Sequence, residues 1–203
     1  MYMIEATVTD NVHKFRKYCE IKVEVEEING ENKTIVTRDA QPKDVFHRWD
    51  PDRIYIIHHV LINKAYNILQ FIINTMPDWE SVNFIYSMTL DSYSYFHLLA
   101  FNLYYDTSSE KGKSCFPDST RPELECMKLL LNQPQIIQGI NINSKDRLGA
   151  TCLHYLACMR DVVDIFKLFV EKGADLTLKD KEENYIIHYA IRHHNVSIYL
   201  SYF

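Results

Sequence analysis

Two closely similar phrases recur in the last third of the chain. The phrase DRLGATCLHYLA begins at Asp146 and DKEENYIIHYAI begins at Asp180, an offset of 34, and a glycine, Gly139 or Gly173, stands 7 residues before each aspartate. A fixed period of this length is typical of helical-hairpin repeats, in which each unit buries its apolar side against the next. The spacing therefore predicts an all-α solenoid of stacked helix-turn-helix units.

The residues around each phrase supply signals for turns and helix ends. We expect Thr151 to cap the first helix of its unit, because its hydroxyl can accept from an otherwise unpaired backbone N–H. Gly149 stands where a tight turn needs a positive φ, and Gly173 stands where the second helix ends in a left-handed cap. Each unit is thus expected to begin with a tight turn, here called a finger, followed by a helix pair.

Weaker copies of the phrase occur earlier in the chain. In DPDRIYIIHHVL, the offset from Asp50 to His58 equals the offset from aspartate to histidine in the two later phrases. A further helix is expected around His97, in SYFHLLA. The offsets between successive histidines of the pattern, continuing through His154 to His188, are unequal, so the earlier units must contain insertions.

The longest insertion is placed between the two helices of the unit around His97. Residues 104–121 are polar and rich in turn formers, which predicts a long loop. A new helix is expected at about Pro122, because Thr120 and Glu123 have the spacing of a capping box.

The N-terminal segment shows two different periodicities. After Asp10, apolar residues such as Val12 and Phe15 recur at helical spacing. Residues 20–38 begin instead with alternating apolar and charged side chains and contain the turn-forming dipeptide Asn29-Gly30. The pattern predicts half a helical unit followed by a β-hairpin insertion.

These phrases together resemble the ankyrin-repeat family, most specifically over residues 140–191. The resemblance implies an N-terminal region, residues 1–45, that consists of a capping half-repeat and the hairpin insertion. The repeats would then occupy residues 46–203, at about 50–86, 87–145 with the inter-helix loop 104–121, 146–179, and an incomplete 180–203.

The resemblance implies a non-catalytic protein-protein interaction module, an adaptor or inhibitor that binds a partner protein through a concave surface of fingers and first helices. Tyr155 and Tyr189 are the favoured anchors, since tyrosine combines contact area with a polar tip. Carried over position by position, the expected partner-binding residues are Arg147, Leu148, Ala150, Tyr155, Met159, Arg160, Lys181, Glu182, Asn184, Tyr189, Arg192 and His193. The matching residues of an earlier repeat are Asp52, Arg53, Ile54, His59, Ile62 and Asn63.

Some positions depart from the family pattern. Glu183 and Arg53 replace the turn glycine, and Tyr185 and Tyr55 replace the capping threonine, so we expect distorted fingers at these two places. Divergent repeats broken by insertions occur among viral and pathogen-delivered ankyrin proteins and among IκB-like inhibitors of Rel-type transcription factors. Two alternatives therefore stay open: an IκB-like inhibitor, or the substrate-recognition part of a larger enzyme or ubiquitin-ligase complex.

Composition and net charge restrict the classes of partner and the cellular compartment that we expect. The 203 residues are 47% hydrophobic, which suffices for a sizeable core, and a net charge of -5 disfavours nucleic acid or an anionic membrane as the main partner. Five cysteines without an even framework indicate reduced thiols. We expect a cytoplasmic protein, with the nucleus as the alternative, and the host cytoplasm if the source is a pathogen.

Clusters that suggest chemistry have structural explanations. The four pattern histidines each occupy the position where imidazole bridges backbone groups of adjacent loops, so they are not expected to converge on a metal. Cys152, close to His154 and Cys158, fills a slot that proline usually holds, and no orienting group or oxyanion site is visible. GKS at 112–114 lacks the first glycine and preceding strand of a phosphate-binding loop. We therefore predict no enzyme activity, no cofactor, no metal and no small-molecule substrate.

The last expected helix, VSIYLSYF, has one apolar side formed by Val196, Tyr199, Leu200 and Phe203. The end of a solenoid needs a polar face for solubility. This side therefore predicts either further stacking in a longer protein or a contact surface.

Overall fold

The chain folds into short helices joined in pairs, as a computed structural model of the protein shows. The structure describes residues 2–18, 21–28, 31–38, 56–75, 93–108, 121–134, 137 and 140–202. Two compact units divide the chain, residues 1–84 and residues 85–203. The mainly helical composition confirms the predicted all-α repeat class.

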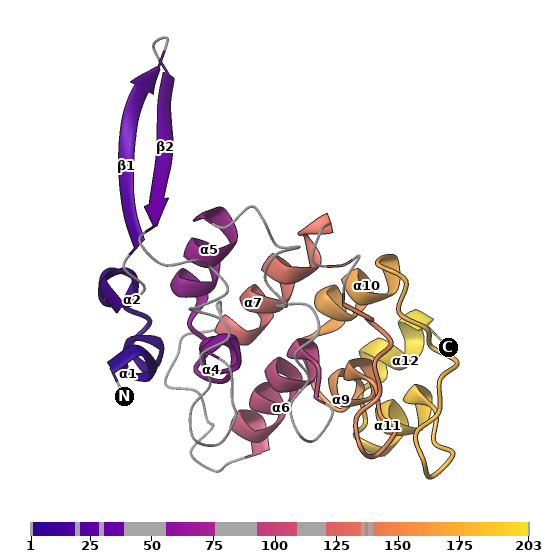
Figure 1. Cartoon of the computed structure of the whole chain (residues 1–203). Helices are drawn as coiled ribbons and strands as arrows, with labels where there is room; N and C mark the ends of the chain where they lie inside the picture. The colour runs from indigo at the N-terminus through magenta and orange to yellow at the C-terminus, as the bar shows by residue number, and fades with distance from the viewer. Residues whose placement is uncertain are drawn as a thin grey trace. The chain divides into compact units, whose positions relative to one another are not determined.

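The described helices of the second unit lie in two rows (Figure 1). The first helices α6, α9 and α11 contact one another in that order, and so do the second helices α7, α10 and α12. Each first helix also packs against the second helix of its own pair. The bounds are Tyr95–Ser108 for α6, Pro122–Leu131 for α7, Cys152–Ala157 for α9, Val163–Glu171 for α10, Ile186–Arg192 for α11 and Val196–Tyr202 for α12.

Apolar side chains at helical spacing form the core between these rows. In α10, Ile165, Phe166 and Phe169 are all buried. The Phe169 ring meets the Phe96 ring of α6 edge-on, at a centroid distance of 4.9 Å. Leu153 of α9 is only 2% exposed. Burial of such side chains contributes roughly 1.5 to 3 kcal/mol each, so hydrophobic contact is the main force that holds the rows together.

The predicted turn and cap residues lie at the ends of the helices. Gly149 and Gly173 have φ of +75° and +96°, as their positions required. The N–H of Ala174 donates to the carbonyl of Phe169 over 3.0 Å, which closes α10 in a left-handed turn. Thr151 is the N-cap residue of α9.

The described helices of the first unit also pair. α1 (Tyr2–Val8) packs against α2 (Val12–Tyr18) and against α4 (Ile56–Ile62), and α5 (Tyr66–Thr75) packs against both α2 and α4. This is the same side-by-side relation of first and second helices that the second unit shows.

One left-handed residue recurs in the turn between paired helices. Asp10 and Lys64 in the first unit have φ of +46° and +57°, and Asp161 and His194 in the second unit have φ of +59° and +54°. Such values are uncommon outside glycine. The pairs α1-α2, α4-α5, α9-α10 and α11-α12 are therefore each joined by a turn that contains one left-handed residue.

A two-stranded antiparallel hairpin follows α2. Strands β1 (Ile21–Ile28) and β2 (Glu31–Arg38) pair in a register that runs from Ile21 opposite Arg38 to Ile28 opposite Glu31. Both strands lie within the range 20–38 that carries the alternating pattern, and the dipeptide Asn29-Gly30 lies outside the described residues.

The predicted loop at 104–121 begins too early. α6 continues to Ser108, so residues 104–108 are helical. The stretch YYDTS contains no glycine or proline, and nothing in it ends a helix. α7 does begin at Pro122, as predicted, but its N-cap is Arg121, with extended backbone and no side-chain cap, where a capping box at Thr120 was predicted.

Several predictions fall outside the described residues. These include Thr120 itself, the finger around Arg53 and Tyr55, the GKS segment and the domain boundary between residues 45 and 46. Among the residues that the structure does describe, no helix combines the length and apolar character needed to cross a bilayer.

Candidate functional site

The first described finger is built around one carboxylate. Oδ1 of Asp146 accepts from the backbone N–H groups of Leu148 and Ala150, at 2.8 and 2.9 Å. The N–H of Gly149 donates to the Asp146 carbonyl over 3.0 Å, and the N–H of Asp146 donates to the Ala150 carbonyl over 2.9 Å. Four hydrogen bonds within five residues thus define the turn that precedes α9.

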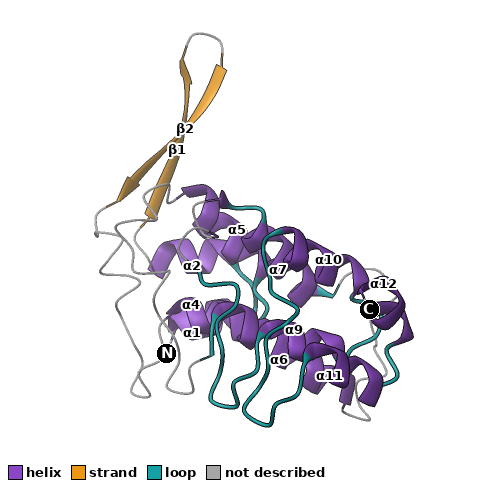
Figure 2. Ribbon diagram, turned by 90° about the vertical axis from the view of Figure 1, so that its right-hand side faces the viewer, coloured by secondary structure: helices purple, strands orange, loops and turns teal. Residues whose placement is uncertain are grey.

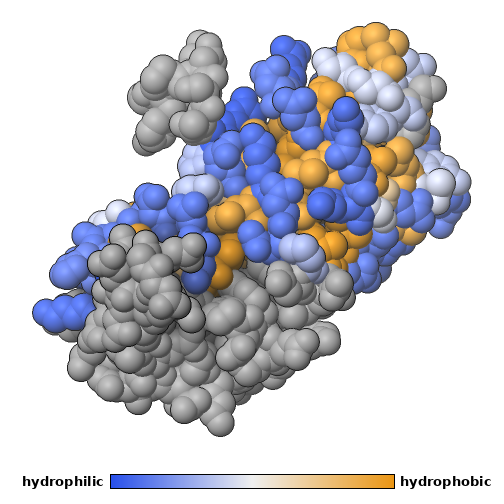
Figure 3. All heavy atoms as spheres, turned by 90° about the horizontal axis from the view of Figure 1, so that it is seen from above, coloured by the Kyte–Doolittle hydropathy of each residue, from blue (hydrophilic) through white to orange (hydrophobic). Residues whose placement is uncertain are grey.

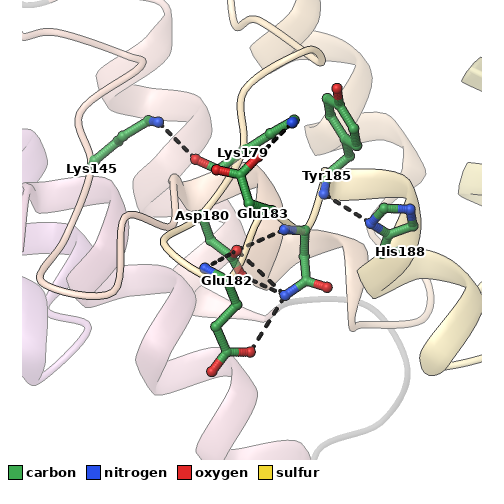
Figure 4. A network of polar contacts seen from close by, with 8 residues as sticks. Lys145, Lys179, Asp180, Glu182, Glu183, Tyr185 and His188 are labelled. Atoms are coloured by element: carbon green, nitrogen blue, oxygen red, sulfur yellow. Dashed lines mark hydrogen bonds and ion pairs between the residues drawn. The ribbon is translucent and has the colours of Figure 1, made fainter.

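The second finger repeats this construction, so the expectation of a distorted finger there is wrong. Oδ1 of Asp180 accepts from the backbone of Glu182 and Asn184, at 2.9 and 2.8 Å (Figure 4). Glu183, in the place of the turn glycine, adopts φ of +63°. Glu183 is thus a non-glycine residue in the left-handed region, within a turn whose backbone N–H groups donate to Asp180. Tyr185 likewise serves as the N-cap of α11.

The two fingers are hydrogen-bonded to each other. The N–H of Lys181 donates to the Leu148 carbonyl over 2.9 Å. Nζ of Lys145 donates to the Lys179 carbonyl over 2.7 Å, a contact between equivalent positions of successive repeats (Figure 4). Figure 2 shows the finger loops, in teal, beside the first helices. Adjacent fingers therefore form one continuous edge of the second unit.

Histidines of the pattern connect a helix start to the next finger. Nδ1 of His97 accepts from the N–H of Ser94 over 3.2 Å, and its Nε2 donates to the Ala150 carbonyl over 3.0 Å. Burial lowers the pKa of His97, which keeps this imidazole neutral. The predicted bridging role is therefore confirmed at His97, and His58 is likewise buried, in α4.

His154 repeats the first half of this arrangement. Its Nδ1 accepts from the Thr151 N–H over 3.0 Å. Burial lowers its pKa, while the Asn184 carbonyl acts in the opposite direction, although Nε2 does not reach hydrogen-bond geometry with it. Two neutral imidazoles thus stand between successive layers.

The two tyrosines expected to anchor a partner are tied to their own fingers. The hydroxyl of Tyr155 donates to Oδ2 of Asp146, and that of Tyr189 donates to Oδ2 of Asp180 over 2.7 Å. Burial and then these hydrogen bonds raise the pKa of both hydroxyls. Both side chains are half-buried, so only part of each ring faces solvent.

Aromatic rings continue across the first helices on the same side. The Phe101 ring lies 5.4 Å from Tyr155, and the His154 ring meets the Tyr189 ring edge-on at 5.1 Å. The guanidinium of Arg192 lies 5.7 Å from the centre of the Tyr189 ring. We call Phe101, Tyr155 and Tyr189 the aromatic row.

Most of the predicted partner-binding residues lie at the surface, but two do not. Ala150 and Met159 are 1% and 3% exposed, so their assignment to the surface is wrong. The exposed members are Arg147, Leu148, Arg160, Lys181, Glu182 and Arg192, and the half-buried members are Tyr155, Asn184, Tyr189 and His193.

The matching residues of the earlier repeat are only partly described. His59 and Asn63 are half-buried and Ile62 is 37% exposed. The Asn63 side chain donates to the Thr7 hydroxyl over 3.2 Å, which links α4 to α1. Residues 52–54 lie outside the described residues.

Some residues that connect one helix pair to the next were not predicted from the sequence patterns. Oδ1 of Asp10 accepts from the N–H of Ile68, and its Oδ2 accepts from the N–H of Asn67, both at 3.0 Å, so it caps α5 of the next pair. The Asn195 amide donates to the Ala157 carbonyl over 3.2 Å. The only available signal for such residues is an Asp or Asn near a turn between two helices.

The apolar side of α12 is exposed in part. Val196 and Leu200 are 60% and 74% exposed, and Tyr199 is 41% exposed. Phe166, which takes the place of Tyr199 in the preceding second helix α10, is fully buried. Figure 3 views the molecule from above and shows apolar residues, in orange, among hydrophilic ones on its described surface. Phe203 lies outside the described residues.

The thiols near His154 are protonated at neutral pH. Burial raises the pKa of Cys152 well above its usual range and that of Cys158 to about 12. A thiol rather than a thiolate is a weak nucleophile and a weak metal ligand. Within the described ranges, three or more His, Cys, Asp or Glu side chains nowhere gather in the way that would hold a metal ion.

Comparison with known proteins agrees with the repeated geometry. Residues 119–201 match a family model described as ankyrin repeats in 3 copies. The match includes α7 to α11, nearly all of α12 and both fingers, and it does not extend to the β1-β2 hairpin. A search of curated proteins found no match to the chain.

Proposed function

Residues 119–201 belong to the ankyrin-repeat family, and on this basis we propose that the chain is a non-catalytic interaction module, an adaptor or inhibitor that binds a partner protein. Ankyrin repeats generally mediate protein-protein interaction. The proposed binding surface is the inner surface of the second unit, defined as the two fingers (residues 145–149 and 179–184) with the exposed sides of α9 and α11 and the turns that follow these helices.

Preorganisation of the fingers is the observation that carries this proposal. The backbone of each finger is held by an aspartate, and the two fingers are joined by the Lys181 to Leu148 hydrogen bond. The Leu148 side chain is nevertheless 63% exposed. A rigid backbone that presents an exposed apolar side chain loses little conformational entropy when a partner binds.

Affinity capture with matched variants tests the proposal. The full chain, Leu148→Asp and Lys167→Asp are immobilised separately, and retained proteins from native cells are quantified by mass spectrometry. Lys167 lies on α10, away from the fingers, and is exposed as well. We expect a set of proteins that the parent and Lys167→Asp retain and Leu148→Asp loses. Equal retention by all three forms would refute the inner surface as the binding site.

A further inference from the structure

Positive charge on the inner surface is exposed, while part of its negative charge is turned inward. Asp146 and Asp180 each accept two backbone N–H groups and a tyrosine hydroxyl. The cations of this surface are Lys145, Arg147, Arg160, Lys179, Lys181 and Arg192, and its carboxylates are Asp146, Asp161, Asp180, Glu182 and Glu183.

Two cations of the outer helices, Lys128 on α7 and Lys167 on α10, lie within ion-pair distance of an acidic neighbour. Nζ of Lys128 lies 2.8 Å from the Glu125 carboxylate, and Nζ of Lys167 lies 3.9 Å from that of Glu171. On the inner surface, Lys179 pairs with Glu183 at 2.6 Å. Lys181, Arg160 and Arg192 form no ion pair with any carboxylate that the structure describes. These three cations are available to an incoming anion.

The aromatic row lies among these cations. Arg192 stacks over the Tyr189 ring at 5.7 Å, and Arg160 follows the end of α9, the helix that carries Tyr155. Phe101 extends the row onto α6, 5.4 Å from Tyr155. Apolar ring area and unpaired positive charge therefore share one surface.

Resting on the proposed function, we propose that the inner surface recognises an acidic polypeptide segment that carries an aromatic side chain. Carboxylates of the segment pair with Lys181, Arg160 and Arg192, and its ring packs on Tyr155 and Tyr189. Charged pairs of this kind set orientation and association rate, and the buried ring supplies most of the affinity.

The distribution of charge favours a polypeptide over a nucleic acid. Glu182 and Glu183 stand on the second finger beside Lys181, and the whole chain has a net charge of -5. A phosphate backbone carries one negative charge at every nucleotide and would meet these carboxylates. A polypeptide can place neutral residues opposite them.

Fluorescence anisotropy with defined polymers tests this assignment on the full chain. The probes are a labelled random copolymer of glutamate and tyrosine, polyglutamate, a copolymer of lysine and tyrosine, and a dT20 oligonucleotide. Arg160→Glu with Lys181→Glu reverses two inner charges, and Lys128→Glu with Lys167→Glu makes the same charge change on the outer helices. Arg192→Glu is a second inner variant, and circular dichroism with urea unfolding checks that each variant folds.

We expect the glutamate-tyrosine copolymer to bind best, and to lose about tenfold in affinity in the inner double variant, equivalent to about 1.4 kcal/mol. The outer double variant should bind as the parent does. Equal losses in both double variants, equal binding of polyglutamate, or equal binding of dT20 would each overturn the assignment. If the captured cell proteins are retained by the inner double variant, the acidic partner is refuted while the interaction function stands; if nothing is captured by the parent, the proposed function itself fails.

Discussion

Replacing Gly149 by alanine tests how closely the two fingers approach. A Cβ at this position would lie 2.9 Å from the backbone N of Lys181 and 3.2 Å from the carbonyl carbon of Asp180. Both are backbone atoms, which cannot rotate away. Alanine must also adopt φ of +75°, which costs about 1 to 2 kcal/mol.

The close approach adds a second cost. Relief of the clash separates the fingers and breaks the 2.9 Å hydrogen bond from Lys181 to the Leu148 carbonyl. Loss of such a bond costs about 0.5 to 1.5 kcal/mol. We therefore expect Gly149→Ala to lower the free energy of unfolding by about 1.5 to 3.5 kcal/mol.

Gly173→Ala is the matched control. Gly173 has φ of +96°, and nothing lies within 4 Å of its hypothetical Cβ. This φ is farther than that of Gly149 from the centre of the left-handed region that other residues can adopt, so backbone strain at Gly173 is at least as large. Any excess loss at Gly149 therefore reports the contact between the fingers.

Urea unfolding followed by circular dichroism at 222 nm measures both variants. A loss for Gly149→Ala that is no larger than the loss for Gly173→Ala would refute the close approach. Glu183 provides the converse test, since Glu183→Gly should raise the urea midpoint by relieving the strain at φ of +63°. Loss of the exposed ion pair with Lys179 offsets part of that gain.

The remaining predictions concern the core, the tyrosines and pH. Leu153→Ala should lower the free energy of unfolding by about 2 to 5 kcal/mol in urea titration, and an unchanged midpoint would contradict the burial of Leu153. Tyr155→Phe and Tyr189→Phe keep the rings but remove the aspartate hydrogen bonds. Each should therefore lower the free energy of unfolding by about 1 to 2 kcal/mol and leave the partner's dissociation constant almost unchanged. Loss of binding with intact stability would show that the hydroxyls contact the partner instead. Because burial lowers the pKa of His97 and of His154, the unfolded chain binds protons that the folded chain does not, and stability should fall as pH drops below about 6.5, by up to about 1.4 kcal/mol per pH unit for each histidine. Urea midpoints measured at intervals between pH 7.5 and 5.5 check the sign, and a flat profile would contradict it.

The local parts of the fold could be predicted because their hydrogen bonds stay within a few residues. Asp146 contacts groups two and four positions ahead, and His97 contacts Ser94, three positions behind. Such bonds impose a fixed spacing, so the spacing is visible in the sequence. The offset of 9 from Asp146 to Tyr155 and from Asp180 to Tyr189 is equally visible, although its meaning as a hydrogen bond was missed.

The candidate site was predicted less well, because the exposure of a side chain depends on which residues pack over it in the folded chain. Ala150 and Met159 stand at positions that face a partner in the family pattern, yet both are buried in the folded chain. The acceptance of positive φ by Glu183 also depends on context, since the bonds of Asp180 to its neighbours hold the turn.

The period, the fingers and the helix starts follow from the amino-acid sequence alone, since each depends on backbone groups close along the chain. Three features depend instead on packing in three dimensions: which side chains are buried, the capping by Asp10 of a helix 57 residues away, and the inward carboxylates of Asp146 and Asp180 beside an exposed Lys181. These features depend on contacts between successive repeats, and the number of residues that separates two repeats varies with each insertion. No constant spacing in the sequence therefore predicts these contacts.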